Sequence, residues 1–414
     1  LARVGIIPDG EAAAIERELR TIAADALRRE IAIERADEDG HTVIEARLIE
    51  RLGDAGKKVH TGRSRNDQVT AATRLYTRAA LLDISNAGRR LVELLLRRAQ
   101  EEARTVMPGR THLQIAMLST FGLWLASWAE QLLDDLELLA AVADLNDRSP
   151  LGSAASYGTP LPLDREFVAD LLGFRGIQNN VLAVQHSRGV LDGRIAEALA
   201  GVSTTLGRMA QDLIIFSLPE IGYVRLPEDL CSGSSIMPQK RNPDILELLR
   251  ARAGTVDGYA TQCRNVVRSL PSGYNRDLQD TKEPLMRALA AVEESLIVSE
   301  TLVSRLTPDR DRMRGALNSE VFATDYAYRL VEEGVPFREA YRRAAAEYRD
   351  QAMPDPDEAL DRRRSTGTPG TLNLEAARDR LAAVGTRSQA IANRHDAAVA
   401  ALLGEGVTLR PQSE

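Results

Sequence analysis

Residues 191–213 read LDGRIAEALAGVSTTLGRMAQDL, and their apolar side chains recur at three- and four-residue steps, close to a heptad repeat. This spacing puts the apolar side chains on one face of a helix. Four other stretches carry similar stripes, and helices of about 25 residues would each be about 38 Å long. The sequence therefore predicts an extended bundle of long helices. The other stripes run from Leu81 to Leu95, from Phe121 to Leu139, from Ile245 to Val267 and from Leu285 to Leu296.

The composition also favours helices. Of the 414 residues, 44% are hydrophobic but only 4% are aromatic, so the core must be built mainly from Leu, Ala, Val and Ile. Because β-sandwiches and barrels depend on aromatic and β-branched residues, we expect an all-α fold. At about 150 residues per domain, the length indicates two to three domains. We divide the chain into an N-terminal helical domain at 1–62, a central long-helix bundle at 63–312 and a small helical C-terminal domain at 313–414.

The charge balance limits the classes of partner. The formal net charge is −7, which argues against nucleic acid or an anionic membrane surface as the main partner. No apolar run approaches the roughly 18 residues of a membrane span, and no signal peptide is visible. Cys231 and Cys263 form neither a disulfide framework nor a zinc motif, so we expect a cytoplasmic protein. An anionic ligand would need a locally basic site.

The loop at 231–243, CSGSSIMPQKRNP, is the most informative polar segment. Asn242 and Pro243 have the residue types of a helix N-cap and first helical position, so the loop is predicted to lead into a helix N-terminus. With the Ser234 hydroxyl and the Lys240 ammonium nearby, that end could hold an anionic group. A capped helix after a flexible surface loop would explain the same residues. Spacing alone leaves both interpretations open.

Three further runs concentrate hydrogen-bonding side chains: HTGRSRNDQ at 60–68, GRTHLQ at 109–114 and YNRDLQDTK at 274–282. In the first, two arginines at i and i+2 could grip a carboxylate. In the second, His112 is predicted to lie just before an amphipathic helix. The histidines have no H-x-x-x-H spacing, so we predict no metal site.

Taken together, these segments resemble one family, argininosuccinate lyase and its δ-crystallin relatives within the fumarase/aspartase superfamily. The superfamily's signature, G-S-S-x-M-P-x-K-x-N, stands intact at 233–242. The runs HTGRSRNDQ, THLQ and YNRDLQ look like argininosuccinate lyase rather than fumarase, aspartase or adenylosuccinate lyase. The similarity extends over most of the chain, through DEDGHTVIEARL at 37–48, DREFVADLLGF at 164–174 and FATDYAYRLVEEGVPFREA at 322–340.

The resemblance implies both a fold and a reaction. The implied fold is fumarase/aspartase-like: a long central helical bundle with smaller helical domains at both ends. The implied reaction is the reversible β-elimination of argininosuccinate to arginine and fumarate in arginine biosynthesis, without a cofactor or metal. Elements from three subunits of a homotetramer would form each active site.

The resemblance also implies roles for individual residues. Ser234 matches the catalytic base, and Lys240 and Asn242 are placed to stabilise its alkoxide and the carboxylate intermediate. His112 matches the family's active-site histidine, and Glu247 matches the glutamate that pairs with it. The positions that match substrate-binding residues are Ser64, Arg65, Asn66, Thr111, Asn242, Tyr274, Gln279 and Lys282.

The chain departs from the family pattern in three places. Met117 and Leu118 replace a Gln-Pro pair, AVQHSRG at 183–189 replaces AVSDRD, and about fifty residues that would form an N-terminal wall of the substrate site have no counterpart before LARVGIIPDGE. These departures leave open a related lyase that eliminates fumarate from another N-substituted aspartate. A catalytically silent, δ-crystallin-like structural protein is a further alternative, although the retained Ser234 and His112 argue against it.

Overall fold

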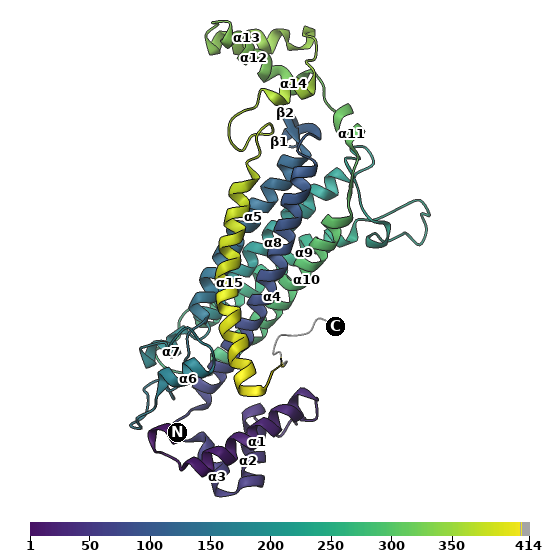
Figure 1. Ribbon diagram of the computed structural model, residues 1–414. Helices are drawn as coiled ribbons and strands as arrows, with labels where there is room; N and C mark the ends of the chain where they lie inside the picture. Colours follow the sequence, from purple (N-terminus) through teal and green to yellow (C-terminus); the bar gives the residue numbers. More distant parts are fainter. Residues whose placement is uncertain (406, 408–414) are drawn as a thin grey trace.

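The computed structural model describes residues 1–405 and 407 and shows an elongated molecule built along a bundle of long helices (Figure 1). All five predicted stripes are helical, as expected for an all-α protein. The longest, α4, has 37 residues, which corresponds to about 55 Å. The bundle helices are α4 (Arg65–Glu101), α5 (Phe121–Asn146), α8 (Val190–Phe216), α9 (Asp244–Val267) and α10 (Lys282–Arg305).

One continuous apolar core joins these five helices. Leu91, Leu132, Leu199 and Leu296 are fully buried members of it, and its aromatic residues are few. Phe121, Trp124 and Phe216 gather at one end, where the Phe121 and Trp124 ring centroids lie 5.2 Å apart. Aliphatic side chains thus build the core, in agreement with the low aromatic content.

Local capping explains where two of the helices begin. Ser64 is the N-cap of α4 and forms a capping box with Asp67. Thr120 caps α5 by accepting a hydrogen bond from the backbone N–H of Leu123. The start of α9 differs from the prediction by one residue, because the helix begins at Asp244 with Pro243 in the N-cap position. The amide of Asn242, the predicted N-cap, instead bonds to the preceding loop.

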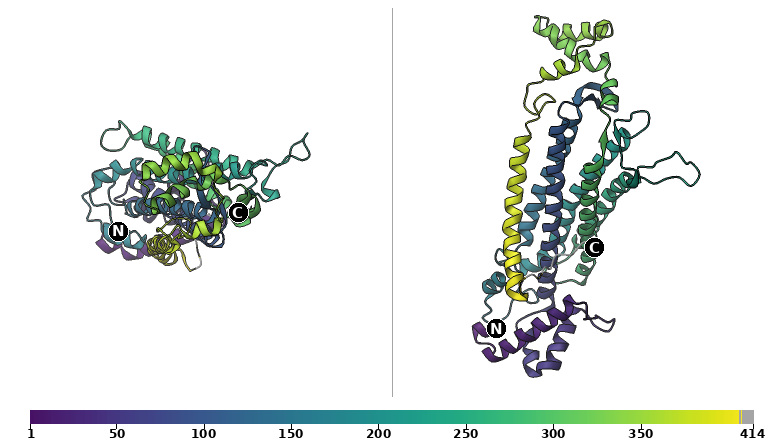
Figure 2. Two further views of the ribbon diagram at one scale, coloured as in Figure 1. Left: turned by 90° about the horizontal axis from the view of Figure 1, so that it is seen from above. Right: turned by 45° about the vertical axis from the view of Figure 1, so that its right-hand side comes forward.

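A sixth long helix, α15 (Leu374–Leu403), lies alongside α4 and α5 (Figures 1 and 2). Its Leu374, Leu381 and Val384 belong to the main core. The domain prediction placed this segment with residues 313–362 in a small C-terminal domain. The helices of 313–362 lie beyond the end of the bundle, whereas α15 returns along it. The division into three domains remains a proposal.

A β-hairpin stands where the sequence predicted a loop leading directly into a helix. Strands β1 (Val106–Thr111) and β2 (Gln114–Thr120) pair antiparallel, and α5 begins only at Phe121. His112 therefore lies in a hairpin turn and not before a helix. The hairpin connects the end of α4 to the start of α5. There, Val106 and Leu118 of the hairpin pack with Val321 and Phe322 in a second small core.

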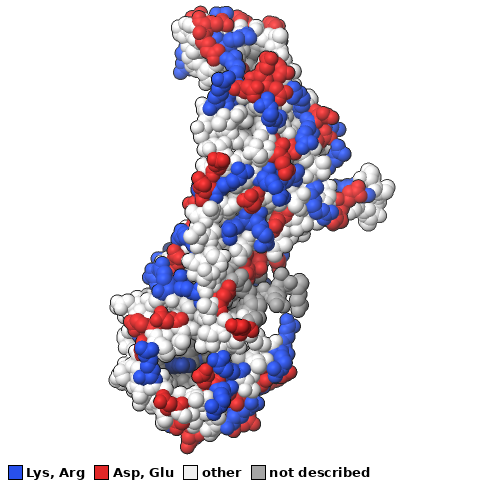
Figure 3. Space-filling model, in the orientation of Figure 1, with Lys and Arg blue, Asp and Glu red and all other residues white. Residues whose placement is uncertain are grey.

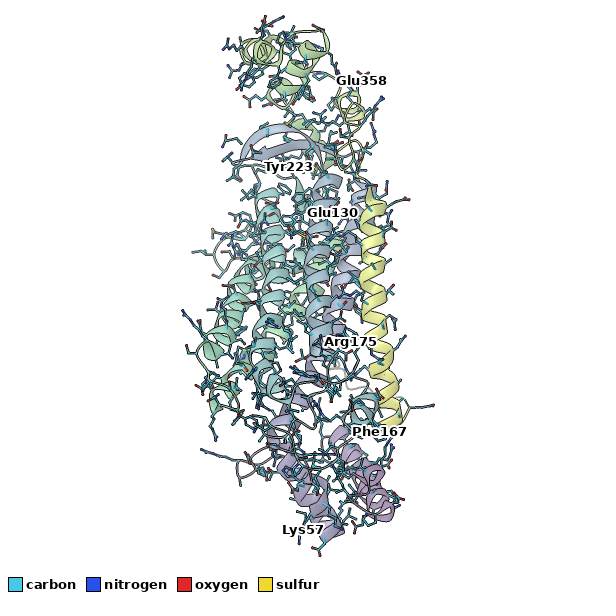
Figure 4. All side chains as sticks on the ribbon, turned by 90° about the vertical axis from the view of Figure 1, so that its left-hand side faces the viewer. Lys57, Glu130, Phe167, Arg175, Tyr223 and Glu358 are labelled. Atoms are coloured by element: carbon cyan, nitrogen blue, oxygen red, sulfur yellow. The ribbon has the colours of Figure 1, made fainter. Side chains whose placement is uncertain are left out.

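Shorter elements occupy both ends of the bundle. In Figure 4 the labelled Lys57, from the N-terminal helices, and Glu358, from α14, lie near opposite ends of the molecule. Among the described residues, no helix is both long enough and apolar enough to cross a membrane. The shorter α-helices are α1 (Asp9–Leu27), α2 (Gly40–Leu52), α3 (Asp54–Lys57), α6 (Arg165–Leu171), α7 (Val181–Ser187), α11 (Arg310–Gly315), α12 (Ala323–Glu332), α13 (Phe337–Glu347) and α14 (Pro356–Asp361). The remaining elements are the 3₁₀ helices at Ala2–Val4, Lys58–His60, Glu228–Leu230, Arg276–Thr281, Ser319–Phe322 and Tyr348–Asp350, and the short strands β3 (Val224–Arg225) and β4 (Thr307–Pro308).

Candidate active site in three separated groups

The structure distributes the predicted site residues over three places in the chain's fold. We name them by position. The α4-start group is Ser64, Arg65, Asn66, Tyr274, Gln279 and Lys282; the hairpin group is Thr111 and His112; the loop group is Ser234, Lys240, Asn242 and Glu247.

The α4-start group is organised around the first turn of α4. The Ser64 hydroxyl accepts a hydrogen bond from the Asn66 backbone N–H (3.2 Å), and an Asp67 carboxylate oxygen accepts one from the Ser64 N–H (3.0 Å). Arg65 forms an ion pair with Asp39, at 2.7 Å between Nη1 and Oδ1. Asp39 also caps α2, so one carboxylate ties the N-terminal helices to this end of the bundle.

The segments around Asn66 and Tyr274 meet through Arg188, a residue that the sequence analysis did not assign. Its guanidinium Nη1 donates to Asn66 Oδ1 (2.8 Å), and its guanidinium carbon lies 5.0 Å from the centre of the Tyr274 ring. Gln279 Nε2 donates to Tyr274 Oη (3.1 Å), and Lys282 Nζ donates to Gln279 Oε1. The structure therefore joins these residues, far apart in sequence, into one polar chain.

The electrostatics at this end favour an anion. Burial lowers the pKa of the Lys282 ammonium, and the positive charge of Arg188 lowers it further. Burial raises the pKa of the nearby Asp192 carboxyl, which accepts a hydrogen bond from the Thr281 hydroxyl (2.7 Å). Arg188 and Lys282 line the same narrow cavity at the end of the bundle, together with Arg74 and Asp192. A carboxylate ligand there would relieve the repulsion between the two cations.

Asp67 is a second residue of this region that the sequence analysis left without a role. Its side chain is fully buried, and its second carboxylate oxygen accepts hydrogen bonds from the backbone N–H groups of Gly152 and Ala154. It thereby holds the 152–154 loop against the first turn of α4. The available signal was the Ser64-x-x-Asp67 spacing, a variant of the capping-box pattern.

The loop at 231–243, which carries Ser234, Lys240 and Asn242, projects from the side of the bundle between β3 and α9 (Figures 1 and 2). Ser234 Oγ accepts hydrogen bonds from the backbone N–H groups of Ile236 (3.3 Å) and Met237 (3.1 Å). Two amide dipoles therefore point at the hydroxyl oxygen, an arrangement that would stabilise negative charge on it. The Lys240 side chain and Glu247, on the first turn of α9, are exposed.

Asn242 closes the neck of this loop. Its backbone N–H donates to the Ser232 carbonyl (2.8 Å), and the Asn242 carbonyl accepts from the Ser232 N–H (3.2 Å). Its side-chain amide donates to Ser232 Oγ and to the Gly233 carbonyl. These bonds shape the residues that lead into Ser234, so the structure gives Asn242 a local positioning role.

The hairpin group lies in a two-residue turn with an unusual backbone. His112 (φ 53°) and Leu113 (φ 61°) are both in the left-handed region, although neither is glycine. This conformation matches the twist of a tight hairpin, and the Arg110 guanidinium supports it by donating to the Leu113 carbonyl (3.0 Å). The turn presents an exposed Thr111 and His112 at the end of the molecule.

Within one chain, the α4-start group lies too far from the hairpin group and from the loop group for one small molecule to contact all three. The α4-start and hairpin groups lie at opposite ends of α4, about 55 Å along the helix. The loop group lies at the start of α9 and Tyr274 just after its end, and 24 residues of helix correspond to about 36 Å. Any site that uses all three groups must draw them from different copies of the chain.

Comparisons with known proteins identify the family. The model of a family described as Lyase matches residues 1–258. The chain is 48% identical to the argininosuccinate lyase of Sorangium cellulosum over 384 residues, which cover 92% of this chain and 88% of that protein. The chain belongs to the argininosuccinate lyase family. Its similarity to the Stenotrophomonas maltophilia argininosuccinate lyase is 41% identity, with 93% of this chain and 89% of that protein covered.

Solved structures of other lyases share the fold. An EDDS lyase in complex with formate superposes with a TM-score of 0.83 at 25% identity, covering 97% of this chain and 89% of that one. The class II fumarase of Schistosoma mansoni superposes with a TM-score of 0.69 at 18% identity, covering 87% of this chain and 85% of that one. The fumarase/aspartase-like fold expected from the sequence is therefore confirmed. The family of the chain also confirms the expectation that it is a lyase.

Proposed function

We propose that this protein cleaves argininosuccinate to arginine and fumarate by β-elimination, as a cytoplasmic enzyme of arginine biosynthesis. The observation that carries the proposal is the 48% identity to an argininosuccinate lyase over 92% of the chain. The same relatives favour argininosuccinate over another N-substituted aspartate and over a silent structural role. No cofactor is part of the proposal.

The chemistry requires a strong base beside concentrated positive potential. Ser234, as its alkoxide, would take the proton from the carbon next to a carboxylate, and the electron pair would move into that carboxylate. The intermediate would then expel the guanidino nitrogen and form the carbon–carbon double bond of fumarate. The amide N–H groups of Ile236 and Met237 at Ser234 Oγ support this role, because they would lower the cost of an alkoxide.

The remaining predicted residues would complete the site. Lys240 would stabilise the doubly charged carboxylate intermediate. His112, paired with Glu247, would protonate the leaving nitrogen or orient the groups that do so. The α4-start group, with Asn66, Tyr274 and Lys282, would bind the substrate's carboxylates.

We further propose a homotetramer in which different copies supply the three groups to each site. The separations of about 55 Å and 36 Å along α4 and α9 support this, because within one chain they keep the α4-start group away from both the hairpin group and the loop group. Exposed apolar side chains on the bundle helices, such as Leu138 and Leu248, are consistent with helices that pack against other copies.

The deciding experiment is an assay of the protein with argininosuccinate, in which fumarate is followed by its ultraviolet absorbance and arginine by chromatography. Ser234→Ala is expected to lower kcat at least about a hundredfold, the range for removal of a general base, with unchanged circular dichroism and oligomer size. Normal turnover by the variant would remove Ser234 from the base role. A well-folded wild type that cleaves another fumarate adduct but not argininosuccinate would overturn the proposed substrate.

A further inference from the structure

Among the described residues, Arg188 is the one that connects the Asn66 and Tyr274 sides of the α4-start group, by a hydrogen bond to the first and a ring contact with the second. It lies in the segment AVQHSRG, where the sequence departs from the family pattern. Its side chain is buried, with 9% of the residue exposed, and Gln185 Oε1 is a second acceptor for Nη1 (3.3 Å). Arg188 is thus a buried arginine that contacts two predicted substrate-binding residues.

The backbone around Arg188 is held firmly on both sides. On one side, the Arg74 guanidinium donates to Ser187 Oγ (2.8 Å), and Arg74 is itself buried. On the other side, Gly189 has φ 69° and packs so closely that a Cβ atom there would lie 2.4 Å from Val267 Cγ1. Only glycine fits this approach without displacement. The guanidinium is therefore delivered to Asn66 and Tyr274 by a preformed backbone.

The hydrogen bond from Arg188 determines which way the Asn66 amide points. A guanidinium can only donate hydrogen bonds, so its bond to Asn66 fixes Oδ1 toward Arg188 and turns the Nδ2 hydrogens away. One of them faces Ser64 Oγ at a long 3.4 Å, which leaves donor capacity for a ligand. Tyr274 Oη accepts from Gln279, so its own hydroxyl proton also remains free to donate. Both residues thus present donors, as an anionic ligand requires.

We propose that Arg188 is a positioning residue that orients Asn66 as a hydrogen-bond donor and holds the Tyr274 ring beside it, so that both residues can bind a carboxylate of the substrate. This inference rests on the proposed function, since it concerns the substrate of that same site. Arg188 acts mainly on substrate binding, because the α4-start group holds the ligand while the base belongs to the loop group.

Steady-state kinetics with argininosuccinate test the inference. Arg188→Met removes the donors and the charge at similar length, and we expect KM to rise at least tenfold with a smaller change in kcat. Arg188→Lys keeps the charge without the planar fork of the guanidinium, and its KM should lie between those of the wild type and Arg188→Met. The matched control is Arg264→Gln, which removes an exposed arginine that pairs with Glu197 on the same bundle and should leave KM within twofold of the wild type.

Two further measurements separate positioning from a merely structural role. First, added guanidinium ion at millimolar concentration should lower the KM of Arg188→Ala but not that of Arg264→Gln. Second, if Arg188 acts through Asn66, the double variant Arg188→Ala/Asn66→Ala should show a smaller fold-increase in KM than the product of the fold-increases of the two single variants.

The inference is overturned if an active wild type and Arg188→Met share the same KM within twofold. If Arg188→Met does not fold, the KM of Arg188→Lys decides in the same way. A wild type that is folded but inactive on argininosuccinate would overturn the proposed function, and this inference with it. An active wild type with unchanged variants would overturn this inference alone.

Discussion

At the scale of single residues, polar side chains that hold two backbone segments together determine the local geometry of this protein. Asp67 accepts hydrogen bonds from the N–H groups of Ser64, Gly152 and Ala154, and Asn242 closes the neck of the Ser234 loop. Asp67 lies beside the predicted site residues Ser64 and Asn66, and Asn242, itself a predicted site residue, shapes the loop that carries Ser234. The predicted site residues are therefore held in place by hydrogen bonds to the backbone as well as by the helices that carry them.

Asp135, on α5, gives a pH-dependent prediction at this scale. Burial raises its pKa from 3.8 to about 6, although Thr205 donates a hydrogen bond to it (2.6 Å). The folded state therefore binds the Asp135 proton more tightly than the unfolded state does. Protonation of Asp135 thus stabilises the fold at low pH, and this contribution to the free energy of unfolding is lost as the pH rises from about 4 through about 6. Asp135→Asn should accordingly melt at a higher temperature than the wild type at pH 8, and this difference should shrink as the pH approaches 4. Melting curves across this range check it, and a constant difference would contradict it.

At the scale of elements, a buried polar network joins α15 to the bundle. Arg78 of α4 is 3% exposed; it contacts Asp147 Oδ1 (3.4 Å) and donates to the carbonyls of Leu172 and Gly173. Asp147, just after α5, also pairs with Arg394 of α15 (2.7 Å). Three helices thus meet at one carboxylate, which explains how a charged helix is docked against an apolar bundle.

We expect Asp147→Ala to lower the free energy of unfolding by about 3–5 kcal/mol, because it removes the carboxylate that pairs with the buried Arg78 guanidinium. Asp144→Ala is the matched control. It also removes an α5 carboxylate that pairs with an arginine of α15, Arg387, but both partners are partly exposed, so the loss should be below about 1 kcal/mol. Urea unfolding measures both, and equal losses would contradict the role of the buried pair.

At the scale of the whole molecule, acidic and basic side chains are interspersed along the face shown in Figure 3. The net charge of the chain is −7. Basic side chains instead gather locally, where Arg74, Arg188 and Lys282 line one cavity together with the single carboxyl of Asp192. The molecule's length separates the groups of the proposed site, so a function that needs all of them is a property of the assembly.

Mixed oligomers test this sharing. His112→Asn and Ser234→Ala should each be inactive alone, but co-refolded at equal amounts they should recover about a quarter of wild-type activity, because one site in four draws both groups from intact copies. Co-refolding Ser234→Ala with Lys240→Ala should recover nothing, because both residues belong to one loop and every site then has a damaged loop. Equal recovery in the two mixtures would contradict sharing between copies.

Much of this architecture could be predicted from the sequence, and the failures have physical causes. The stripes from Leu81 to Leu296 predicted five helices because burial of one face imposes a helical period. The hairpin at His112 was missed because tertiary packing decided between helix and strand for a short segment. The docking of α15 along the bundle was not predicted, since none of the five stripes lies in residues 374–403.

The sequence by itself determined the helices, the family and the residue types of the proposed site, because periodicity and the motif at 233–242 are local properties of the chain. Only the tertiary structure decided that Arg188 meets Asn66, 122 positions away, and that the proposed site residues form three separate groups. Such contacts depend on how long helices cross and how far they extend. Packing of the whole chain sets those quantities, and no local pattern records them.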